Sequence, residues 1–441
     1  MRSEVSATIR LAAPIALANI GNQLLGLVDT AVVGRLGEMQ LGAVGLGNSV
    51  YFAVAVVGLG LMLGLDPLVA QAVGAGERLR ARSTLWQGIW IAALLTLPLA
   101  AVITGVVLVL APLGIEAETA AETASYAFAR LPGLPFFLVM VGTRSFLQAH
   151  SITIPIVIGV VVANVVNLPL SILLVFGDAS LGIPQMGAAG AAWTSTVCTV
   201  LQCGIVLGAV RLLQKPPGAV SRRPSREVIA RALRLGAPVG LALLAEVGLF
   251  AVVGVLIGLL GTRPLAAHNV AIQLIATTFQ VPLAIGAAAS VRVGHAVGRN
   301  DAEGTRRAGL AALFVCVVFM GGTSLLFVLL PRPLAALITD ETPVIAAAVP
   351  LILVAAAFQL GDGVQAVAAG ALRGAGDTRF AMVANLLGHY GVGLPVGVLL
   401  AWGAGWGATG LWWALTAGLS TVAVALALRF LAISRRTVAR V

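Results

Sequence analysis

Apolar stretches of about 20 residues recur along the whole chain, and each is long enough to cross a bilayer core of about 30 Å as an α-helix. Only 10% of the 441 residues are charged and 59% are hydrophobic, too little polarity to cover a water-facing surface. The short alternating segments of a transmembrane β-barrel are absent. We therefore predict an all-α integral membrane protein with twelve transmembrane helices, at residues 8–33, 43–66, 84–111, 126–149, 153–176, 186–210, 228–259, 265–290, 306–330, 344–371, 380–402 and 406–432.

The net charge of +10 is distributed by side of the membrane. Basic residues gather in alternate loops and in the tail, whereas the opposite loops carry acids such as Glu116, Asp178 and Asp340. By the positive-inside rule both termini are cytoplasmic. The basic excess indicates topology and attraction to anionic lipid head groups, not a nucleic-acid partner. We expect a multi-pass protein of the inner membrane that functions as a monomer, in contact with the lipid bilayer.

The two halves of the chain repeat each other. "IRLAAP" (9–14) recurs as "LRLGAP" (233–238), a shift of 238 − 14 = 224. The same shift superposes Leu36-Gly37 on Leu260-Gly261, while "GAAGAAW" (187–193) matches "GATGLWW" (407–413) at a shift of 220. Six spans per half give both halves the same orientation, so we expect two six-helix bundles related by a pseudo-two-fold axis along the membrane normal. The predicted lobes are residues 1–211 and 228–441, joined by a cytoplasmic linker at 212–227.

Three acids lie within predicted spans, namely Asp29, Glu246 and Asp362. A charged side chain at the bilayer centre costs about 2.5–3.5 kcal/mol on insertion scales. Such a group is either a proton or cation site, or a structural hydrogen-bonding group between helices. We favour cation coupling, because three acids occur on three separate helices. The repeat superposes Glu246 on Asn22 and Asp29 on Val253, so the acids are not duplicated and the two lobes are expected to differ in role.

Other polar side chains follow the helical spacing that places residues i, i+3, i+4 and i+7 on one face. Either these stripes hold helices together, each hydrogen bond contributing about 0.6 kcal/mol on average, or they line a wet cavity. Because several helices carry them, we expect a shared interior without lipid. The stripes are Asn22 with Asp29; Asn164, Asn167 and Ser171; Gln273, Thr277 and Gln280; and Gln359, Asp362 and Gln365.

The chain resembles the MATE (multidrug and toxic compound extrusion) family, and in particular its NorM-like branch. The resemblance lies in "LVDTAVVGRLG" (27–37), "LDPLVAQAVGAG" (65–76), "AEVGLFAVV" (245–253), "LAAHNVA" (265–271), "SVRVGHAVGRND" (290–301) and "GDGVQAVAAGALRGAGDTR" (361–379). It implies twelve helices in two lobes and export of amphipathic, often cationic drugs or toxic metabolites by antiport with Na⁺ or H⁺. It also implies that Asp29, Glu246 and Asp362 carry cation coupling.

The sequence departs from the family pattern at several positions. The fifth span reads "NLPLS", so Asn167 matches while Ser171 replaces a second amide or acid. Asn269 stands where glutamine is common, which bears on ion or cargo contacts. Gly391 stands where an aromatic residue is usual, which bears on the shape of the cavity.

The expected mechanism is alternating access. Binding of Na⁺ or H⁺ at Glu246 and Asp362, or at Asp29, neutralises buried carboxylates, favours one arrangement of the lobes and expels a small-molecule drug. No cofactor beyond the coupling ion is expected, no metal site other than a Na⁺ site at these acids, and no nucleotide motif is present.

Two other readings are considered. A flippase for lipid-linked precursors, from the same superfamily, would need basic residues in its cavity, and Arg144 alone is a candidate to face inward. An integral-membrane enzyme would need clustered aspartates, a serine–histidine pair or paired catalytic aspartates. The sequence has no clustered aspartate motif, and its four histidines, His150, His268, His295 and His389, are expected at or near span ends. Asp29 and Asp362 are the two aspartates within spans that could form such a catalytic pair, so the enzyme remains an alternative.

Overall fold

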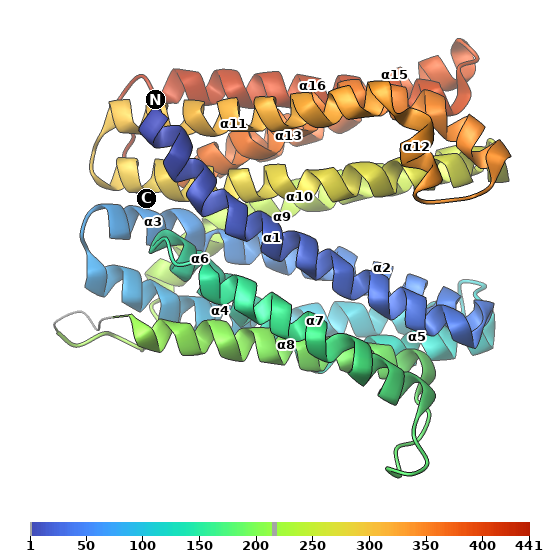
Figure 1. Cartoon of the computed structure of the whole chain (residues 1–441). Helices are drawn as coiled ribbons and strands as arrows, with labels where there is room; N and C mark the ends of the chain where they lie inside the picture. Colours follow the sequence, from blue (N-terminus) through green and yellow to red (C-terminus); the bar gives the residue numbers. More distant parts are fainter. Residues whose placement is uncertain (1, 214–217) are drawn as a thin grey trace. The chain divides into compact units, whose positions relative to one another are not determined.

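The computed structural model describes residues 2–213 and 218–441. Within these ranges it is built of helices (Figure 1). When helical segments that follow one another directly are joined into one, twelve of them are long and apolar enough to cross a membrane. The twelve predicted spans are confirmed. The helices of the first half are α1 (Arg2–Val33), α2 (Glu38–Leu63), α3 (Leu65–Gly74), α4 (Arg78–Leu108), α5 (Ala117–Arg130), α6 (Leu134–Ala149), α7 (Ile154–Phe176) and α8 (Gly187–Leu212), with short 3₁₀ turns η1 (Gly34–Leu36) and η2 (Leu131–Gly133).

The helices of the second half include two π-helical segments. They are α9 (Arg226–Gly258), α10 (Thr262–Gly298), α11 (Ala302–Leu329), α12 (Pro331–Ala336), α13 (Thr342–Ala375), α14 (Thr378–Leu386), α15 (Leu394–Val398) and α16 (Gly407–Ile433), with the π-helical segments η3 (Leu387–Gly393) and η4 (Leu399–Gly403). Segments α14 to η4 together make one span, Thr378–Gly403.

Many spans are longer than their apolar stretches. The second span runs from Glu38 to Gly74, whereas hydropathy predicts 43–66, and the eighth runs from Thr262 to Gly298 instead of 265–290. Hydropathy marks the part of a helix that faces lipid. The helix itself can continue beyond that part, because each backbone N–H still donates to the carbonyl one turn earlier.

The described chain divides into two compact units. The N-terminal unit comprises Leu17–Val69 and Glu77–Gly240, and the C-terminal unit comprises Met1–Ala16, Ala70–Gly76 and Leu241–Val441. The first part of α1 thus packs within the C-terminal unit, and the first part of α9 packs within the N-terminal unit. The lobes 1–211 and 228–441 remain a prediction from the repeat, and part of the linker lies outside the described residues.

In the C-terminal unit, α13 packs against α10, α11 and α16, as the neighbouring ribbons in Figure 1 show. Small residues allow the close approach of α10 and α13. A Cβ atom at Gly370 would lie 2.1 Å from the carbonyl oxygen of Gly286, and one at Gly374 would lie 2.3 Å from that of Ser290. Leu11, Ala12 and Ile15 of α1 belong to the hydrophobic core beside this seam.

In the N-terminal unit, α7 packs against α8, and α5 packs against α2 and α8. The beginning of α9 contacts the end of α2 in the same backbone-to-backbone manner. A Cβ at Gly64 would lie 2.1 Å from the carbonyl oxygen of Ala232, and one at Gly236 would lie 2.2 Å from that of Leu61. These contacts are typical of membrane helices that pack through small residues.

Backbone conformation at matching glycines supports the internal repeat. Gly37 and Gly261, which the repeat superposes, precede the second helix of each half with φ of 110° and 119°. Gly187 and Gly407, which match at the second shift, both have φ of 54°. A positive φ is readily adopted by glycine alone, so each half needs glycine at the same two turns.

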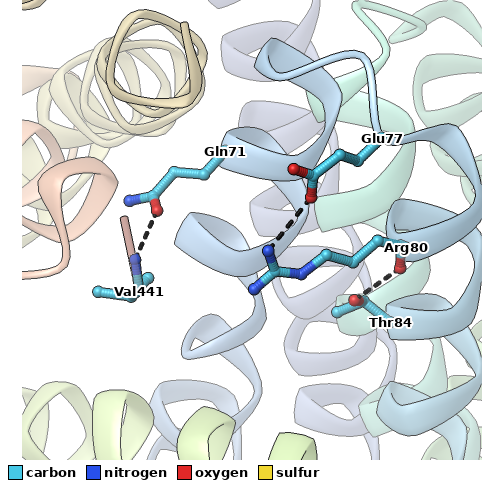
Figure 2. A network of polar contacts seen from close by, with 5 residues as sticks. All are labelled: Gln71, Glu77, Arg80, Thr84 and Val441. Carbon is cyan, nitrogen blue, oxygen red and sulfur yellow. Dashed lines mark hydrogen bonds and ion pairs between the residues drawn. The ribbon is translucent and has the colours of Figure 1, made fainter. Parts of the chain in front are cut away.

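The segment after α16 folds back within the C-terminal unit. The buried amide of Gln71 on α3 donates to the Gly374 carbonyl at 3.1 Å and accepts from the backbone N–H of Val441 at 2.9 Å (Figure 2). In the N-terminal unit, Arg80 pairs with Glu77 one turn away, also drawn in Figure 2. Gln71 therefore ties the final residue to the ends of α3 and α13.

Candidate functional site

A polar cavity of about 370 Å³ lies inside the N-terminal unit. Its walls are formed by residues of α1, α2, α5, α6, α7 and α8. Three of the lining residues, Asp29, Arg130 and Arg144, carry a charged side chain. The lining residues are Asn22, Leu25, Gly26, Asp29, Thr30, Leu41, Val44, Gly45, Asn48, Tyr126, Arg130, Phe137, Met140, Arg144, Asn167, Ser195, Cys198, Thr199 and Gln202. We call this space the N cavity.

Asp29 is the acid of the N cavity, and its side chain is held from two helices. One carboxyl oxygen accepts from the amide of Asn167 on α7 at 2.9 Å, and the other accepts from the hydroxyl of Ser195 on α8 at 2.6 Å. Only 6% of Asp29 is exposed. The two hydrogen bonds hold the carboxyl group of Asp29 in a fixed position on the wall of the N cavity.

Two arginines line the same cavity. The Arg130 guanidinium lies 4.5 Å from the centre of the Tyr51 ring, in a cation–π contact. Arg144 donates to the side-chain oxygen of Asn19 at 3.3 Å. Among the described residues neither arginine forms an ion pair. The inward placement considered for Arg144 is therefore observed, and Arg130 is a second basic residue in the cavity.

A smaller, largely apolar cavity of about 150 Å³ lies in the C-terminal unit, and we call it the C cavity. Glu246 of α9 and Asp362 of α13 both line it, and Asp362 is only 4% exposed. The remaining walls are Phe250, Ile272, Ile275, Ala276 and Phe279. Both carboxyl groups line this one small cavity, so they repel each other when both are ionised. In the described chain neither forms an ion pair with a basic residue.

A chain of buried side chains runs from Glu246 into the C-terminal unit. The amide of Gln365 donates to Glu246 at 3.2 Å and to the side-chain oxygen of Asn385 at 3.1 Å. Nε2 of His389 lies 3.1 Å from that same Asn385 oxygen. The hydroxyl of Tyr390 donates to the carbonyl of Ala245 at 2.8 Å. The π-helical segment η3, which carries His389 and Tyr390, therefore meets the surroundings of Glu246 at two points.

The other polar residues predicted from helical spacing differ in whether they line a cavity, are buried between helices or are exposed. Asn22 lines the N cavity, whereas Asn164 donates to the carbonyls of Gly21 and Val160. Ser171 is buried, and its hydroxyl has no partner in the described residues. Gln359 accepts from Thr278 at 3.0 Å, and Gln280 donates to its own helix. Asn269, Gln273 and Thr277 are exposed residues of α10 that line neither cavity.

Several residues of these sites were not anticipated from the sequence. Ser195, Thr199 and Gln202 have the i, i+4, i+7 spacing used for the other stripes, and Asn385 and His389 are four apart, so the same rule could have found them. Arg130 lies in the predicted span 126–149 together with Arg144, so it could have been considered as an inward-facing arginine in the same way. The expectation that His389 lies near a span end is wrong, because it is fully buried within Thr378–Gly403.

Twelve membrane-crossing helices with charged side chains on the walls of interior cavities are typical of a polytopic membrane transporter. The MatE family model matches the chain twice, at residues 14–173 and 238–399. The two matches begin 238 − 14 = 224 residues apart, the shift of the internal repeat. The chain belongs to the MATE family of multidrug efflux transporters, and it is not an enzyme.

Curated relatives agree over nearly the whole length. The chain is 37% identical to a probable multidrug resistance protein NorM of Bradyrhizobium diazoefficiens, over 99% of this chain and 95% of the relative. It is 33% identical to a multidrug resistance protein NorM of Vibrio vulnificus, over 97% and 95% respectively.

Solved structures show the same fold. A crystal structure of a eukaryotic MATE transporter matches with a TM-score of 0.84 at 25% identity, covering 97% of this chain and 96% of the other. An outward-facing multidrug resistance MATE transporter matches with a TM-score of 0.87 at 18% identity, covering 98% and 97%.

Proposed function

We propose that this protein is a secondary antiporter, which exports amphipathic, often cationic drugs or toxic metabolites in exchange for Na⁺ or H⁺. The observation that supports this proposal is shared by Asp29, Glu246 and Asp362. Each carboxyl group lies on a cavity wall, and none forms an ion pair among the described residues. A buried carboxylate without a fixed cation is available to an exchangeable one.

The C cavity is the stronger candidate for ion coupling. Glu246 and Asp362 repel each other when both are charged, so a proton or Na⁺ that neutralises the pair removes this repulsion. Carboxylate oxygens can bind either ion, and the amide N–H of Gln365 holds one carboxylate oxygen of Glu246 in position. Occupation of the site then favours one arrangement in alternating access, and release favours the other.

Cargo and ion compete for the same negative charges. An organic cation can take the place of the coupling ion beside a carboxylate, and the aromatic rings of Phe250 and Phe279 in the C cavity suit such a cation. A membrane potential of 100 mV contributes about 2.3 kcal/mol for each charge moved, which corresponds to roughly 50-fold accumulation. No covalent step and no cofactor are needed.

We place the protein in the inner membrane as a monomer, with both termini cytoplasmic. The basic loops support this orientation, because positively charged residues are retained on the cytoplasmic side.

A flippase of lipid-linked precursors is the second candidate, and the two arginines in the N cavity favour it. A diphosphate carries at least two negative charges, whereas Asp29 in the same cavity offsets one of the two arginines. The N cavity therefore matches a cargo with a single anionic group better than a diphosphate.

The experiment is transport by the purified protein in liposomes under an imposed Na⁺ gradient and, separately, an imposed pH gradient. We expect one of the gradients to drive cargo movement in the wild type and Glu246→Gln to abolish the coupling. Glu341→Gln is the matched control, because Glu341 is an exposed acid at the start of α13. Full ion-driven transport by Glu246→Gln would remove this residue from the mechanism.

A further inference from the structure

The segment that precedes α9 packs on the start of α4, within the N-terminal unit. We call residues 218–225 of this segment the docked linker. Its backbone is held by side chains of α4 through four hydrogen bonds. They run from Ser83 Oγ to the carbonyl of Ser221 (3.2 Å), from Trp90 Nε1 to that of Arg222 (2.8 Å), from Gln87 Nε2 to that of Arg223 (3.0 Å), and from the backbone N–H of Ser225 to Gln87 Oε1 (2.8 Å).

Two exposed arginine side chains belong to the docked linker, at Arg222 and Arg223. The guanidinium of Arg222 lies 4.8 Å from the centre of the Trp86 ring. A cation–π contact uses the face of the guanidinium, so its N–H donors, which lie in its plane, remain available. Neither arginine forms an ion pair with any residue that the structure describes. Both are therefore able to bind an anionic group from outside the chain.

The surroundings of these two arginines are strongly basic. Residues 77–82 at the start of α4 and residues 218–231 together contain seven arginines and two acids, a net charge of 7 − 2 = +5. Both acids are already paired with an arginine on their own helix, Glu77 with Arg80 and Glu227 with Arg231. A basic cluster of this kind beside a membrane span attracts anionic lipid head groups.

An apolar surface continues from the docked linker along α4. Trp90, Leu94 and Leu97 are 44%, 57% and 78% exposed, and their i, i+4, i+7 spacing places them on one face of the helix. Since α4 is one of the twelve candidate spans, acyl chains contact exposed leucines on this face. Tryptophan is enriched at the boundary between the apolar core and the head groups. The bond from Trp90 to the Arg222 carbonyl therefore places the docked linker at head-group level.

We propose that the docked linker and the start of α4 form a binding site for one anionic phospholipid. Its phosphate binds between Arg222 and Arg223, whose planar guanidinium groups suit bidentate contacts to phosphate. Its acyl chains lie along Trp90, Leu94 and Leu97. A soluble phosphate would lack the apolar contacts, and the ammonium group of a zwitterionic lipid would be repelled by the basic surroundings.

This site is separate from the transport machinery proposed above. None of its residues lines the N cavity or the C cavity, and lipid binding there requires no ion gradient. The proposal therefore stands whether or not the protein is an antiporter.

The test is quenching of tryptophan fluorescence by brominated lipids in liposomes that contain the purified full chain. The liposomes are mixtures of phosphatidylglycerol, which is anionic, and phosphatidylcholine, which is zwitterionic, and the bromine is carried by one lipid or by the other. Because the chain has seven tryptophans, each protein is also measured with Trp90→Phe, and the difference isolates the emission of Trp90. The readout is the preference for phosphatidylglycerol over phosphatidylcholine beside Trp90.

The test variant combines Arg222→Gln with Arg223→Gln. Its matched control combines Arg435→Gln with Arg436→Gln, which removes the same charge from two adjacent exposed arginines after α16. These two lie on the same side of the membrane in the orientation proposed above. Both double variants keep Trp90, so both report through the same fluorophore.

We expect the wild type to prefer phosphatidylglycerol beside Trp90, and the test variant to lose this preference by about 5-fold for each arginine removed, the contribution of one arginine near an anionic lipid surface. The control variant should keep the preference of the wild type. Soluble glycerol 3-phosphate, added at constant ionic strength, should not displace the lipid.

Three results would overturn the proposal. The first is a wild type without preference for phosphatidylglycerol beside Trp90. The second is an equal preference in the test and control variants, which would show that net charge alone, or neither arginine pair, determines it. The third is displacement by glycerol 3-phosphate, which would show that the site recognises a soluble phosphate and not a lipid.

Discussion

Gly370 provides a quantitative test of the seam between α10 and α13. A Cβ atom added there would lie 2.1 Å from the carbonyl oxygen of Gly286, whereas real Cβ atoms essentially never come within 3.0 Å of such an atom. Gly370→Ala must therefore separate the two backbones by at least 3.0 − 2.1 = 0.9 Å. Neither side can yield by rotating a side chain, because the contact is with backbone.

The expected cost follows from comparable overpacking. Inserting a methyl group into a filled contact destabilises a protein by about 1–3 kcal/mol. Alanine also has a better helix propensity than glycine by about 1 kcal/mol, so the variant needs a control with the same chemical change. Gly322 of α11 has no atom within 4 Å of an added Cβ, and the difference between Gly370→Ala and Gly322→Ala isolates the steric cost.

The measurement is the midpoint of thermal unfolding of both variants in the same detergent. With an unfolding entropy of about 2.1 cal/mol/K per residue, the steric cost corresponds to a midpoint about 1–3 °C lower for Gly370→Ala than for Gly322→Ala. Equal midpoints would refute the claim that α10 and α13 are in contact through backbone at this glycine.

Two further predictions concern the ends of helices. Burial, with the nearby charges of Arg82 and Arg78, lowers the pKa of His150 below its ordinary 6.5 despite a hydrogen bond to a backbone carbonyl. The neutral His150 side chain therefore contributes fully to stability above about pH 6.5, and this contribution is lost as the pH falls towards the pKa of the folded state. His150→Gln should reduce the drop in thermal midpoint between pH 7.5 and pH 5.5. An unchanged drop would contradict this reasoning. Gln71→Ala removes the hydrogen bond to Val441, so trypsin should cleave the tail after α16 faster than in the wild type, and equal rates would show that Gln71 does not hold the tail.

The spans were predictable because hydropathy reports directly on helices that face lipid. The repeat was also readable, since "IRLAAP" and "LRLGAP" keep their spacing in both halves. The residues that hydrogen-bond to each acid were harder to predict from the sequence. Asn167 was expected to be a cavity residue from its spacing on α7, but nothing in the sequence indicates that it lies 2.9 Å from Asp29, which is 138 positions away.

One wrong prediction came from a general rule about where histidines lie in membrane proteins. Histidine was assigned to span ends because lone histidines are often interfacial, but His389 is buried beside Asn385 within a π-helical segment. The route of α1 and α9 through the two units could not be inferred, because the repeat assigns each helix to its own half. The assignment of the first part of α9 to the N-terminal unit depends on tertiary contacts such as that of Gly64 with Ala232.

The passage of α1 and α9 between the compact units has a mechanical consequence. These helices cross from one unit to the other at residues 16–17 and 240–241, positions that the shift of 224 superposes. Each crossing follows a proline by two residues, Pro14 in α1 and Pro238 in α9. Proline cannot donate the backbone hydrogen bond that stiffens a helix. Each of these two helices therefore lacks one backbone hydrogen bond in the turn just before the residues at which it leaves its first unit, so bending is opposed less there than elsewhere along the helix.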